Sequence, residues 1–387
     1  MSKIWEHIKN KGPIARCDDE AFMKSALNLA TRGLGNVWPN PAVGCVIVKD
    51  NTVIGRGWTQ PGGRPHAETE ALARAGDAAQ GATAYVTLEP CAHHGQTPPC
   101  AQALIDAGIA RVVIALEDPD ERVSGNGIKM LKTAGIEVTQ NICRQEALEI
   151  NEGFFLRILK NRPLFTMKMA TSLDGRIAVH TGESQWITEA PTRQQGHLLR
   201  ANHDAIMVGI GTATEDNPQL TCRLPGLENH SPVRIVVDRR MRLPLTSNLV
   251  IQAQDIPTWM ITLGDQDDIR AEAYREAGIE MITPDDVSEM DGGITLSWVA
   301  EELAKRGLTR VLVEGGSHLA AAMLRRRLID RLSWMHAPRI MGHDGIPAAQ
   351  AFGVDHLEDT PFFDRTDSFS SGGDLVELYR RRDLDIT

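Results

Sequence analysis

The chain has 387 residues, more than the roughly 250–300 that one hydrophobic core usually organises, so two domains are expected. Hydrophobic residues make up 42% and charged residues 24%, a globular composition that excludes disordered, collagen-like and coiled-coil classes. The net charge is −10 and no basic face dominates, so nucleic acid is not expected as a partner, although a small phosphorylated substrate needs only a few local cations.

The sequence also bears on location and on the use of cysteine. No stretch approaches the ~18 consecutive apolar residues of a membrane span, and Glu6, His7 and Lys9 stand where a signal peptide needs an apolar core. We therefore expect a cytoplasmic protein with no membrane partner. Six cysteines are too few and too scattered for a disulfide framework, so metal binding or catalysis is expected of some of them.

The first part of the chain alternates helices and strands. A helix over 19–33 precedes a hairpin over 43–58, in which the polar pair Asp50-Asn51 separates two apolar runs. The alternation is typical of helices packed on a largely parallel or mixed sheet. The expected elements that follow are helices over 66–75, 98–107, 127–134 and 144–160, and strands over 84–88, 111–116 and 137–141.

The break Asn161-Arg162-Pro163 marks an expected boundary between domains 1–160 and 161–387. The second part restarts with a strand over 164–169 and again favours an α/β domain. The further expected elements are helices over 192–201, 296–305 and 317–328, and strands over 205–209, 233–238, 258–263, 310–314 and 330–339.

A histidine and a glutamate two residues apart, His66 and Glu68, stand at the start of an expected helix. Downstream, Cys91 follows a strand and Cys100 opens the next helix, whose positive N-terminus favours a thiolate. This order of H-x-E and two cysteines is the signature of zinc deaminases that act on nucleobases. His66, Cys91 and Cys100 would leave one zinc position open for water, and Glu68 would transfer its proton. Cys45, within an apolar strand, is expected to pack in the core.

The spacing of the two cysteines distinguishes between families of zinc deaminases. Cytidine and tRNA-adenosine deaminases commonly have P-C-x-x-C, whereas this chain has C-A-H-H-G-Q-T-P-P-C over 91–100. With P-N-P-A-V-G over 39–44, this loop resembles the deaminase domain of the bifunctional riboflavin-biosynthesis deaminase/reductase family. The resemblance implies that Asn40 and the His93-His94 loop hold a diaminopyrimidine ring, although Asn40 between two prolines could equally be a turn residue. Gln96 departs from the family, which often has a basic residue there.

The second domain lacks the G-x-G-x-x-G fingerprint, so a Rossmann domain is not expected. The runs S-L-D-G (172–175), G-E-S-Q-W-I-T (182–188), D-N-P-Q-L-T (216–221) and E-G-G (314–316) look like the reductase domain of the same family, which is similar to dihydrofolate reductase in fold. E-G-G opens an expected helix, where bare N–H groups can meet a cofactor phosphate, although an ordinary strand-to-helix turn would look similar.

The resemblance implies two ligand sets in the reductase domain. Taken singly, Trp186 could be a packing residue, and Arg200 and Arg223 could be surface residues; by resemblance the two arginines hold the substrate phosphate through forked hydrogen bonds. The residues expected to contact NADPH are Ala170, Trp186, Thr212, Asp216, Gly315 and Gly316. The residues expected to contact substrate are Lys168, Ser184, Arg200, Leu220, Arg223 and Glu314.

The resemblance therefore implies a cytidine-deaminase-like α/β/α sandwich followed by a dihydrofolate-reductase-like α/β domain. The implied enzyme is a homo-oligomer of riboflavin biosynthesis. It would deaminate 2,5-diamino-6-(5-phosphoribosylamino)pyrimidin-4-one with zinc and then reduce the ribosyl side chain to ribityl with NADPH. Two alternatives stay open. One is a nucleoside or RNA-base deaminase with an unrelated C-terminal domain, and the other is a non-enzymatic protein whose zinc is structural and closed by a fourth ligand.

Overall fold

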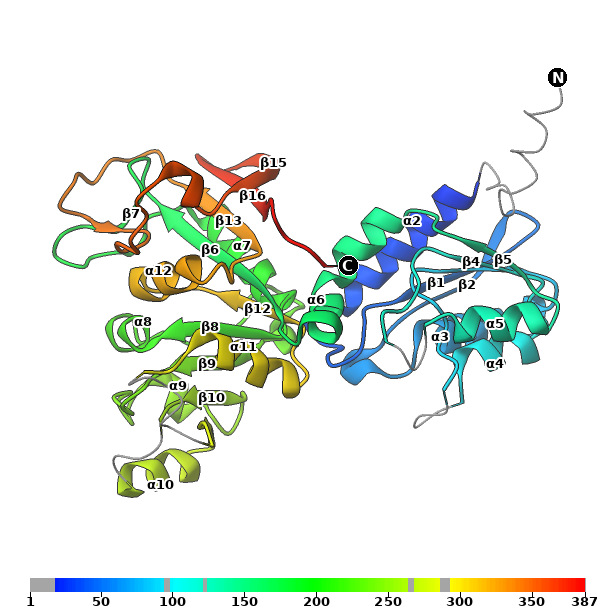
Figure 1. The fold of residues 1–387 in the computed structure, drawn as a ribbon, viewed down its shortest axis with the longest axis horizontal. Coiled ribbons are helices and arrows are strands. Elements are labelled where there is room, and N and C mark those ends of the chain that lie inside the picture. The colour runs from blue at the N-terminus through cyan, green and yellow to red at the C-terminus, as the bar shows by residue number, and fades with distance from the viewer. Residues whose placement is uncertain (1–17, 94–97, 121–123, 264–267, 286–292, 387) are drawn as a thin grey trace. The chain divides into compact units, whose positions relative to one another are not determined.

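The computed structural model describes residues 18–93, 98–120, 124–263, 268–285 and 293–386 (Figure 1). Contacts between Cα atoms divide the chain into two compact units, Met1–Leu159 and Lys160–Thr387. The division falls at the end of helix α6 (Arg144–Lys160), just before Asn161-Arg162-Pro163.

The first unit contains a five-stranded sheet in the order β2-β1-β3-β4-β5. Strands β2 and β3 pair with β1 in antiparallel register, whereas β3, β4 and β5 run parallel. Asp50 and Asn51 turn the β1–β2 hairpin with positive φ angles of 49° and 59°, which suit a two-residue hairpin turn. The strands are β1 (Gly44–Lys49), β2 (Thr52–Trp58), β3 (Thr83–Val86), β4 (Arg111–Ile114) and β5 (Glu137–Gln140).

Helices cover both faces of this sheet. In Figure 1, α2 and α6 lie on one side of the strands and α3, α4 and α5 on the other, which gives the expected α/β/α sandwich. Two glycines allow the close packing. A Cβ atom at Gly44 would lie 1.9 Å from the Ala26 carbonyl oxygen of α2, and one at Gly57 would lie 2.1 Å from the Ala67 carbonyl oxygen of α3. The helices besides α6 are α2 (Asp19–Ala30), α3 (Ala67–Ala75), α4 (Cys100–Asp106) and α5 (Asn126–Thr133).

The second unit contains a nine-stranded sheet in the order β11-β10-β9-β8-β12-β6-β13-β16-β15. The first seven strands of this order, from β11 through β13, run parallel to one another. The hairpin β15–β16 adds an antiparallel edge next to β13. The strands are β6 (Leu164–Thr171), β8 (Ala205–Gly209), β9 (Val233–Val237), β10 (Thr258–Ile261), β11 (Ile279–Ile282), β12 (Arg310–Val313), β13 (Arg331–His336), β15 (Phe363–Ser371) and β16 (Asp374–Arg381), with β7 (Arg176–Ala178) and β14 (Ile346–Pro347) in a small separate sheet.

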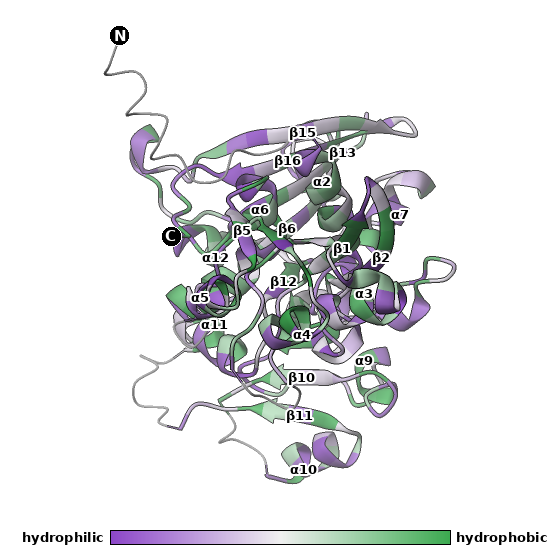
Figure 2. Ribbon diagram, turned by 90° about the vertical axis from the view of Figure 1, so that its right-hand side faces the viewer, coloured by the Kyte–Doolittle hydropathy of each residue, from purple (hydrophilic) through white to green (hydrophobic). Residues whose placement is uncertain are grey.

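The helices of this unit bury apolar faces on the parallel strands, whose residues are mostly apolar and buried because both faces of the sheet are covered. Figure 2 shows hydrophobic residues along β11 and both hydrophobic and hydrophilic residues along α10, as expected of a helix with one face on the sheet. The helices are α7 (Ala190–Ala201), α8 (Ile210–Glu215), α9 (Asn248–Ile251), α10 (Asp268–Glu276), α11 (Leu296–Lys305) and α12 (Ser317–Arg325).

The structure confirms the expected helices and strands within a few residues at their ends and adds elements that the sequence did not predict. The longest of these is the β15–β16 hairpin. Nearly all β15 side chains are exposed or half-buried, so this edge strand has no apolar alternation to reveal it. The two-residue strand β14 and the four-residue helix α9 are too short to show a period. No helix in the described part of the chain is both long and apolar enough to span a membrane.

Candidate functional site

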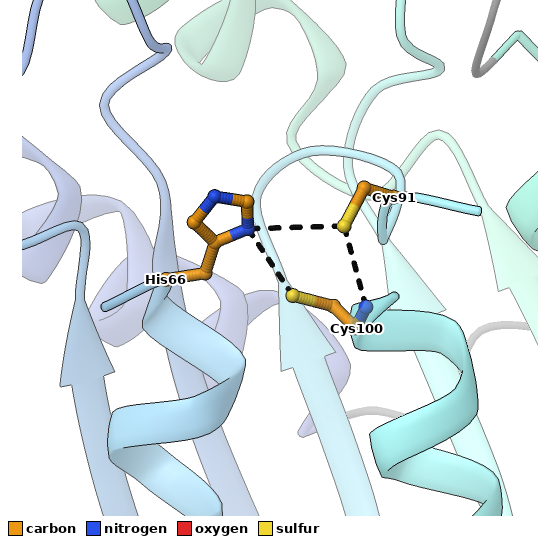
Figure 3. A group of neighbouring side chains, drawn as sticks. All are labelled: His66, Cys91 and Cys100. Atoms are coloured by element: carbon orange, nitrogen blue, oxygen red, sulfur yellow. Dashed lines mark hydrogen bonds between the residues drawn. The ribbon is translucent and has the colours of Figure 1, made fainter. Parts of the chain in front are cut away.

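Three side chains of the first unit converge at the carboxyl end of β3 (Figure 3). His66 directly precedes α3, Cys91 lies in the loop after β3, and Cys100 is the first residue of α4. The His66 Nδ1 atom lies 3.2 Å from the Cys100 Sγ atom and 3.8 Å from the Cys91 Sγ atom. The expected ligand triad is therefore assembled in space, from residues up to 34 positions apart.

The spacing of these atoms fits zinc. In a tetrahedral site, zinc–nitrogen bonds of about 2.0–2.1 Å and zinc–sulfur bonds of about 2.3 Å place a ligand nitrogen about 3.6 Å from a ligand sulfur. All three candidate ligand atoms lie within 4.8 Å of one another. Among the described residues, no fourth histidine, cysteine or carboxylate joins the group. Cys45 is instead fully buried inside β1, which confirms that it packs in the core.

The environment of the triad favours a thiolate beside a buried carboxyl group. A hydrogen bond from Cys100 is the main cause that lowers the pKa of Cys91 to about 4, and the Cys100 backbone N–H also donates to the Cys91 Sγ atom at 3.3 Å. Glu68, in the first turn of α3, is only 4% exposed. Burial raises the pKa of Glu68 to about 7, although the neighbouring His66 opposes this rise. A carboxyl group with such a pKa can both accept and donate a proton near neutral pH.

A cavity of about 200 Å³ opens beside the triad. Asn40 lines this cavity. Asn151 fixes the backbone two residues after Asn40, and Gly63 leaves room for the Asn40 side chain. Asn151 of α6 binds the backbone of Ala42 at both its N–H (2.9 Å) and its C=O (3.0 Å), and a Cβ atom at Gly63 would lie 1.8 Å from the Asn40 amide nitrogen. Asn40 therefore packs closely beside Gly63 at the cavity wall, and its contact with a ligand stays a prediction.

Several cavity residues were not predicted from sequence. Asp118 and Asp120 follow β4, and their place after an apolar strand that runs parallel to β3 is the signal that could have identified them. Glu89 accepts the backbone N–H groups of Asp118 (3.4 Å), Gly125 (3.0 Å) and Ile128 (3.1 Å), and so ties these three residues to the segment that follows β3. The residues lining the cavity include Asn40, Arg64, His66, Glu68, Glu89, Cys91, His93, Asp118, Asp120 and Arg157. His94 and Gln96 lie outside the described residues.

The second unit has a larger cavity, of about 820 Å³. It lies where β6, β12 and β8 end and where α8 and α12 begin, the place at which open α/β sheets bind ligands. All of the reductase residues expected from the sequence line it, namely Lys168, Ala170, Ser184, Trp186, Arg200, Thr212, Asp216, Leu220, Arg223, Glu314, Gly315 and Gly316. Which ligand each of them contacts stays a prediction.

A buried charge cluster forms the floor of this cavity. Arg200 donates to Glu314 through a two-bonded fork, Nε to Oε1 at 2.7 Å and Nη2 to Oε2 at 2.8 Å. Burial alone would raise the pKa of Glu314, but Arg200 and, more weakly, Lys168 outweigh it and the pKa falls to about 2. Burial lowers the pKa of Lys168. In this structure the fork of Arg200 is therefore directed at Glu314, whereas Arg223 is exposed.

The two glycines of the E-G-G segment lie close to Thr212 of α8. Cβ atoms at Gly315 and Gly316 would each lie 3.0 Å from the Thr212 Oγ1 atom, and Gly316 has a φ of 73°. Trp186 is 60% exposed, with the Arg193 guanidinium 4.7 Å from its ring centroid. Trp186 is therefore not a core residue of this unit, and its contact with the cofactor stays a prediction.

Comparison with known proteins matches both units to families. Residues 16–116 match the cytidine and deoxycytidylate deaminase zinc-binding region, and residues 163–365 match the RibD C-terminal domain. The riboflavin biosynthesis protein RibD of Aquifex aeolicus is 39% identical over 363 residues, which cover 94% of this chain and 98% of that protein. RibD of Escherichia coli is 40% identical over 89% of this chain and 94% of that protein.

Solved structures agree over nearly the whole length. Acinetobacter baumannii RibD superposes with a TM-score of 0.83 at 36% identity and covers 95% of this chain and 99% of its own. The Thermotoga maritima diaminohydroxyphosphoribosylaminopyrimidine deaminase/5-amino-6-(5-phosphoribosylamino)uracil reductase superposes with a TM-score of 0.81 at 34% identity, covering 94% of this chain and 98% of its own. The alternative of an unrelated C-terminal domain is therefore wrong.

Proposed function

The chain belongs to the RibD family of riboflavin biosynthesis proteins and is a bifunctional deaminase and reductase that uses zinc and NADPH, and we propose how its residues divide the two reactions. The observation that carries the proposal is that two separate groups of predicted residues each line one cavity, one in each unit. We assign residues 1–160 to the deamination and residues 161–387 to the reduction.

In the first unit, His66, Cys91 and Cys100 would hold zinc. Bound zinc supplies hydroxide near neutral pH. Glu68 takes the proton of the attacking water and passes it to the exocyclic nitrogen, so that a ring C–NH₂ and water become a ring C=O and ammonia. Asn40 holds the pyrimidine ring. The buried, raised-pKa state of Glu68 supports this role.

In the second unit, the cavity would hold NADPH and the deaminated phosphoribosyl compound together. NADPH supplies the hydride, and the protein orients the donor against the sugar carbon. Ala170, Trp186, Thr212, Asp216, Gly315 and Gly316 contact the cofactor, while Lys168, Ser184, Arg200, Leu220, Arg223 and Glu314 contact the substrate. The product is the ribityl compound, two electrons and two protons more reduced than the ribosyl compound.

The substrate of the first step is 2,5-diamino-6-(5-phosphoribosylamino)pyrimidin-4-one, which the name of the Thermotoga maritima relative supports. The small local set of cations in both cavities suits a single phosphate better than a polyanion. A cytoplasmic location and a homo-oligomeric assembly complete the proposal.

The deaminase assignment is tested by Glu68→Gln, with ammonia release and bound zinc measured on the same samples. We expect ammonia release to fall by about 10²–10⁴-fold, because the amide cannot transfer the proton, while zinc stays bound. Glu70→Gln is the matched control: Glu70 lies on the same helix but pairs with Arg74 at its surface. Ammonia release at the wild-type rate in Glu68→Gln contradicts the assignment.

The reductase assignment is tested by NADPH oxidation in the same enzyme. We expect oxidation only when the deaminated compound is present, because the order of the two steps is deamination and then reduction. If Glu68→Gln oxidises NADPH as fast with the diamino compound as with the deaminated compound, the proposed order of the two steps is contradicted.

A further inference from the structure

The turn of the β15–β16 hairpin is hydrogen-bonded to the start of α7. The Glu189 backbone N–H donates to the Asp374 Oδ2 atom at 2.7 Å, and the Gly373 backbone N–H donates to the Glu189 Oε2 atom at 3.0 Å. The Thr192 hydroxyl donates to the Ser371 carbonyl oxygen at 2.8 Å. These three hydrogen bonds, called the hairpin clasp below, join residues that are 179 to 185 positions apart.

The parts of the hairpin clasp fit one another closely. Asp374 and Thr192 are buried, and the Asp374 carboxylate lies at the N-terminus of α7, where the helix dipole favours a negative charge. A Cβ atom at Gly372 would lie 2.4 Å from the Glu189 Oε2 atom, and one at Gly373 would lie 2.8 Å from the Glu189 Oε1 atom. The turn therefore has glycines where the Glu189 carboxylate needs space.

The hairpin clasp acts on the helix turn that supports one wall of the reductase cavity. Residues 184–188 line this cavity, and Glu189, the N-cap residue of α7, follows them directly. Arg193, in the first turn of α7, has its guanidinium 4.7 Å from the Trp186 ring centroid and donates to the Thr188 carbonyl oxygen at 2.7 Å. A continuous series of contacts therefore runs from the hairpin through the start of α7 to Trp186.

Burial in the core fixes only the end of this cavity wall. Ile187 and Thr188 are buried, whereas Gln185 and Trp186 are exposed. A ligand that binds to a mobile segment must order it, and the conformational entropy lost in doing so weakens binding. A wall that is already held by hydrogen bonds at the start of α7 avoids part of this loss.

Neither Glu189 nor Asp374 is among the residues that line the cavity. We propose that both are positioning residues of the reductase, which fix residues 184–188 in the arrangement that binds NADPH and the deaminated compound. The proposal rests on the contacts assigned above to Ser184 and Trp186. It gives the β15–β16 hairpin a part in ligand binding, in addition to its place at the edge of the sheet.

Isothermal titration with NADPH and steady-state NADPH oxidation, both on the full-length enzyme, test the hairpin clasp. In Glu189→Ala, and separately in Asp374→Ala, we expect the dissociation constant and the KM of NADPH to rise by about 5- to 10-fold, because the segment must then be ordered on binding. We expect kcat at saturation to change by less than about 2-fold. Glu189→Gln and Asp374→Asn each keep an acceptor oxygen and should retain the wild-type values.

Gln194→Ala, on the exposed side of α7, is the control variant that should change neither constant. A hairpin that only stabilised the fold would reduce the fraction of active enzyme, so kcat would fall while KM and the dissociation constant stayed the same; that result overturns the proposal.

Trp186→Ala separates this proposal from the cofactor assignment on which it rests. If Trp186→Ala weakens NADPH binding and the alanine variants of Glu189 and Asp374 do not, the hairpin clasp alone is wrong. If Trp186→Ala binds NADPH as tightly as the wild type, the cofactor assignment of this segment is wrong and the proposal fails with it.

Discussion

Glu314 shows how a single residue in the reductase cavity is controlled by its neighbours. Its side chain is nearly fully buried, where a lone carboxylate would be costly, yet the Arg200 fork keeps it ionised. Lys168 is the third member of the cluster, and its own pKa is lowered by burial. A substrate bound at this cluster would therefore meet a preformed arrangement of charges and require little reorganisation of it.

This cluster predicts that removing Arg200 lowers the free energy of unfolding by an amount that depends on pH. The folded-state pKa of Glu314, about 2, lies below its ordinary value of 4.5. The stabilisation it provides is thus present above pH 4.5 and is lost as the pH falls toward 2. We expect Arg200→Ala to lower the free energy of unfolding by about 3–5 kcal/mol at pH 7, because Glu314 is left buried and unpaired. Urea denaturation should show a smaller loss at pH 4.

Arg223→Ala is the control for this measurement. Arg223 is exposed, so its removal should leave the unfolding curve in place while it weakens binding of the phosphorylated substrate. An Arg200→Ala cost that is equal at the two pH values would show that the Glu314 charge is not what the arginine stabilises.

At the scale of elements, the zinc site depends on how closely α3 packs on β2. Gly57 lies where the N-terminal turn of α3 meets the strand, and that turn carries both His66 and Glu68. The backbone approach leaves no room for a side chain. The position of His66 is therefore set by a glycine of the neighbouring strand, which has no functional side chain.

Gly57→Ala tests this dependence. The added Cβ atom would lie 2.1 Å from the Ala67 carbonyl oxygen, so α3 must shift and carry His66 away from the two cysteines. We expect lower zinc content after dialysis against a mild chelator and a loss of about 1–3 kcal/mol of stability from overpacking. Gly293→Ala, with nothing within 4 Å of its new atom, should change neither. Full zinc retention in Gly57→Ala would mean that α3 can adapt without moving its first turn.

At the scale of the whole molecule, the two cavities have no lining residue in common and belong to different compact units. The two half-reactions should therefore be separable by metal removal. We expect a zinc chelator to abolish ammonia release and added zinc to restore it, while NADPH oxidation with the deaminated compound continues at its original rate. Loss of both activities on chelation would show that the reductase also depends on the metal.

The sequence by itself predicted the cluster of His66, Cys91 and Cys100 and most of the helices and strands, because each of these leaves a local pattern. His66 and Glu68 stand two residues apart, Cys91 and Cys100 bound one loop, and apolar periodicity shows which face of each element is buried. The family motifs likewise named the reductase residues that the structure brings into one cavity.

Only the tertiary structure decided which of these residues meet and what surrounds them. The pairing of Arg200 with Glu314 joins residues 114 positions apart, so no local pattern reveals it. Glu89 was missed for the same reason: its partners Asp118, Gly125 and Ile128 lie 29 to 39 positions away in the sequence. Contacts of this kind depend on the free energy of the whole fold, so they cannot be predicted from the local periodicity of the sequence.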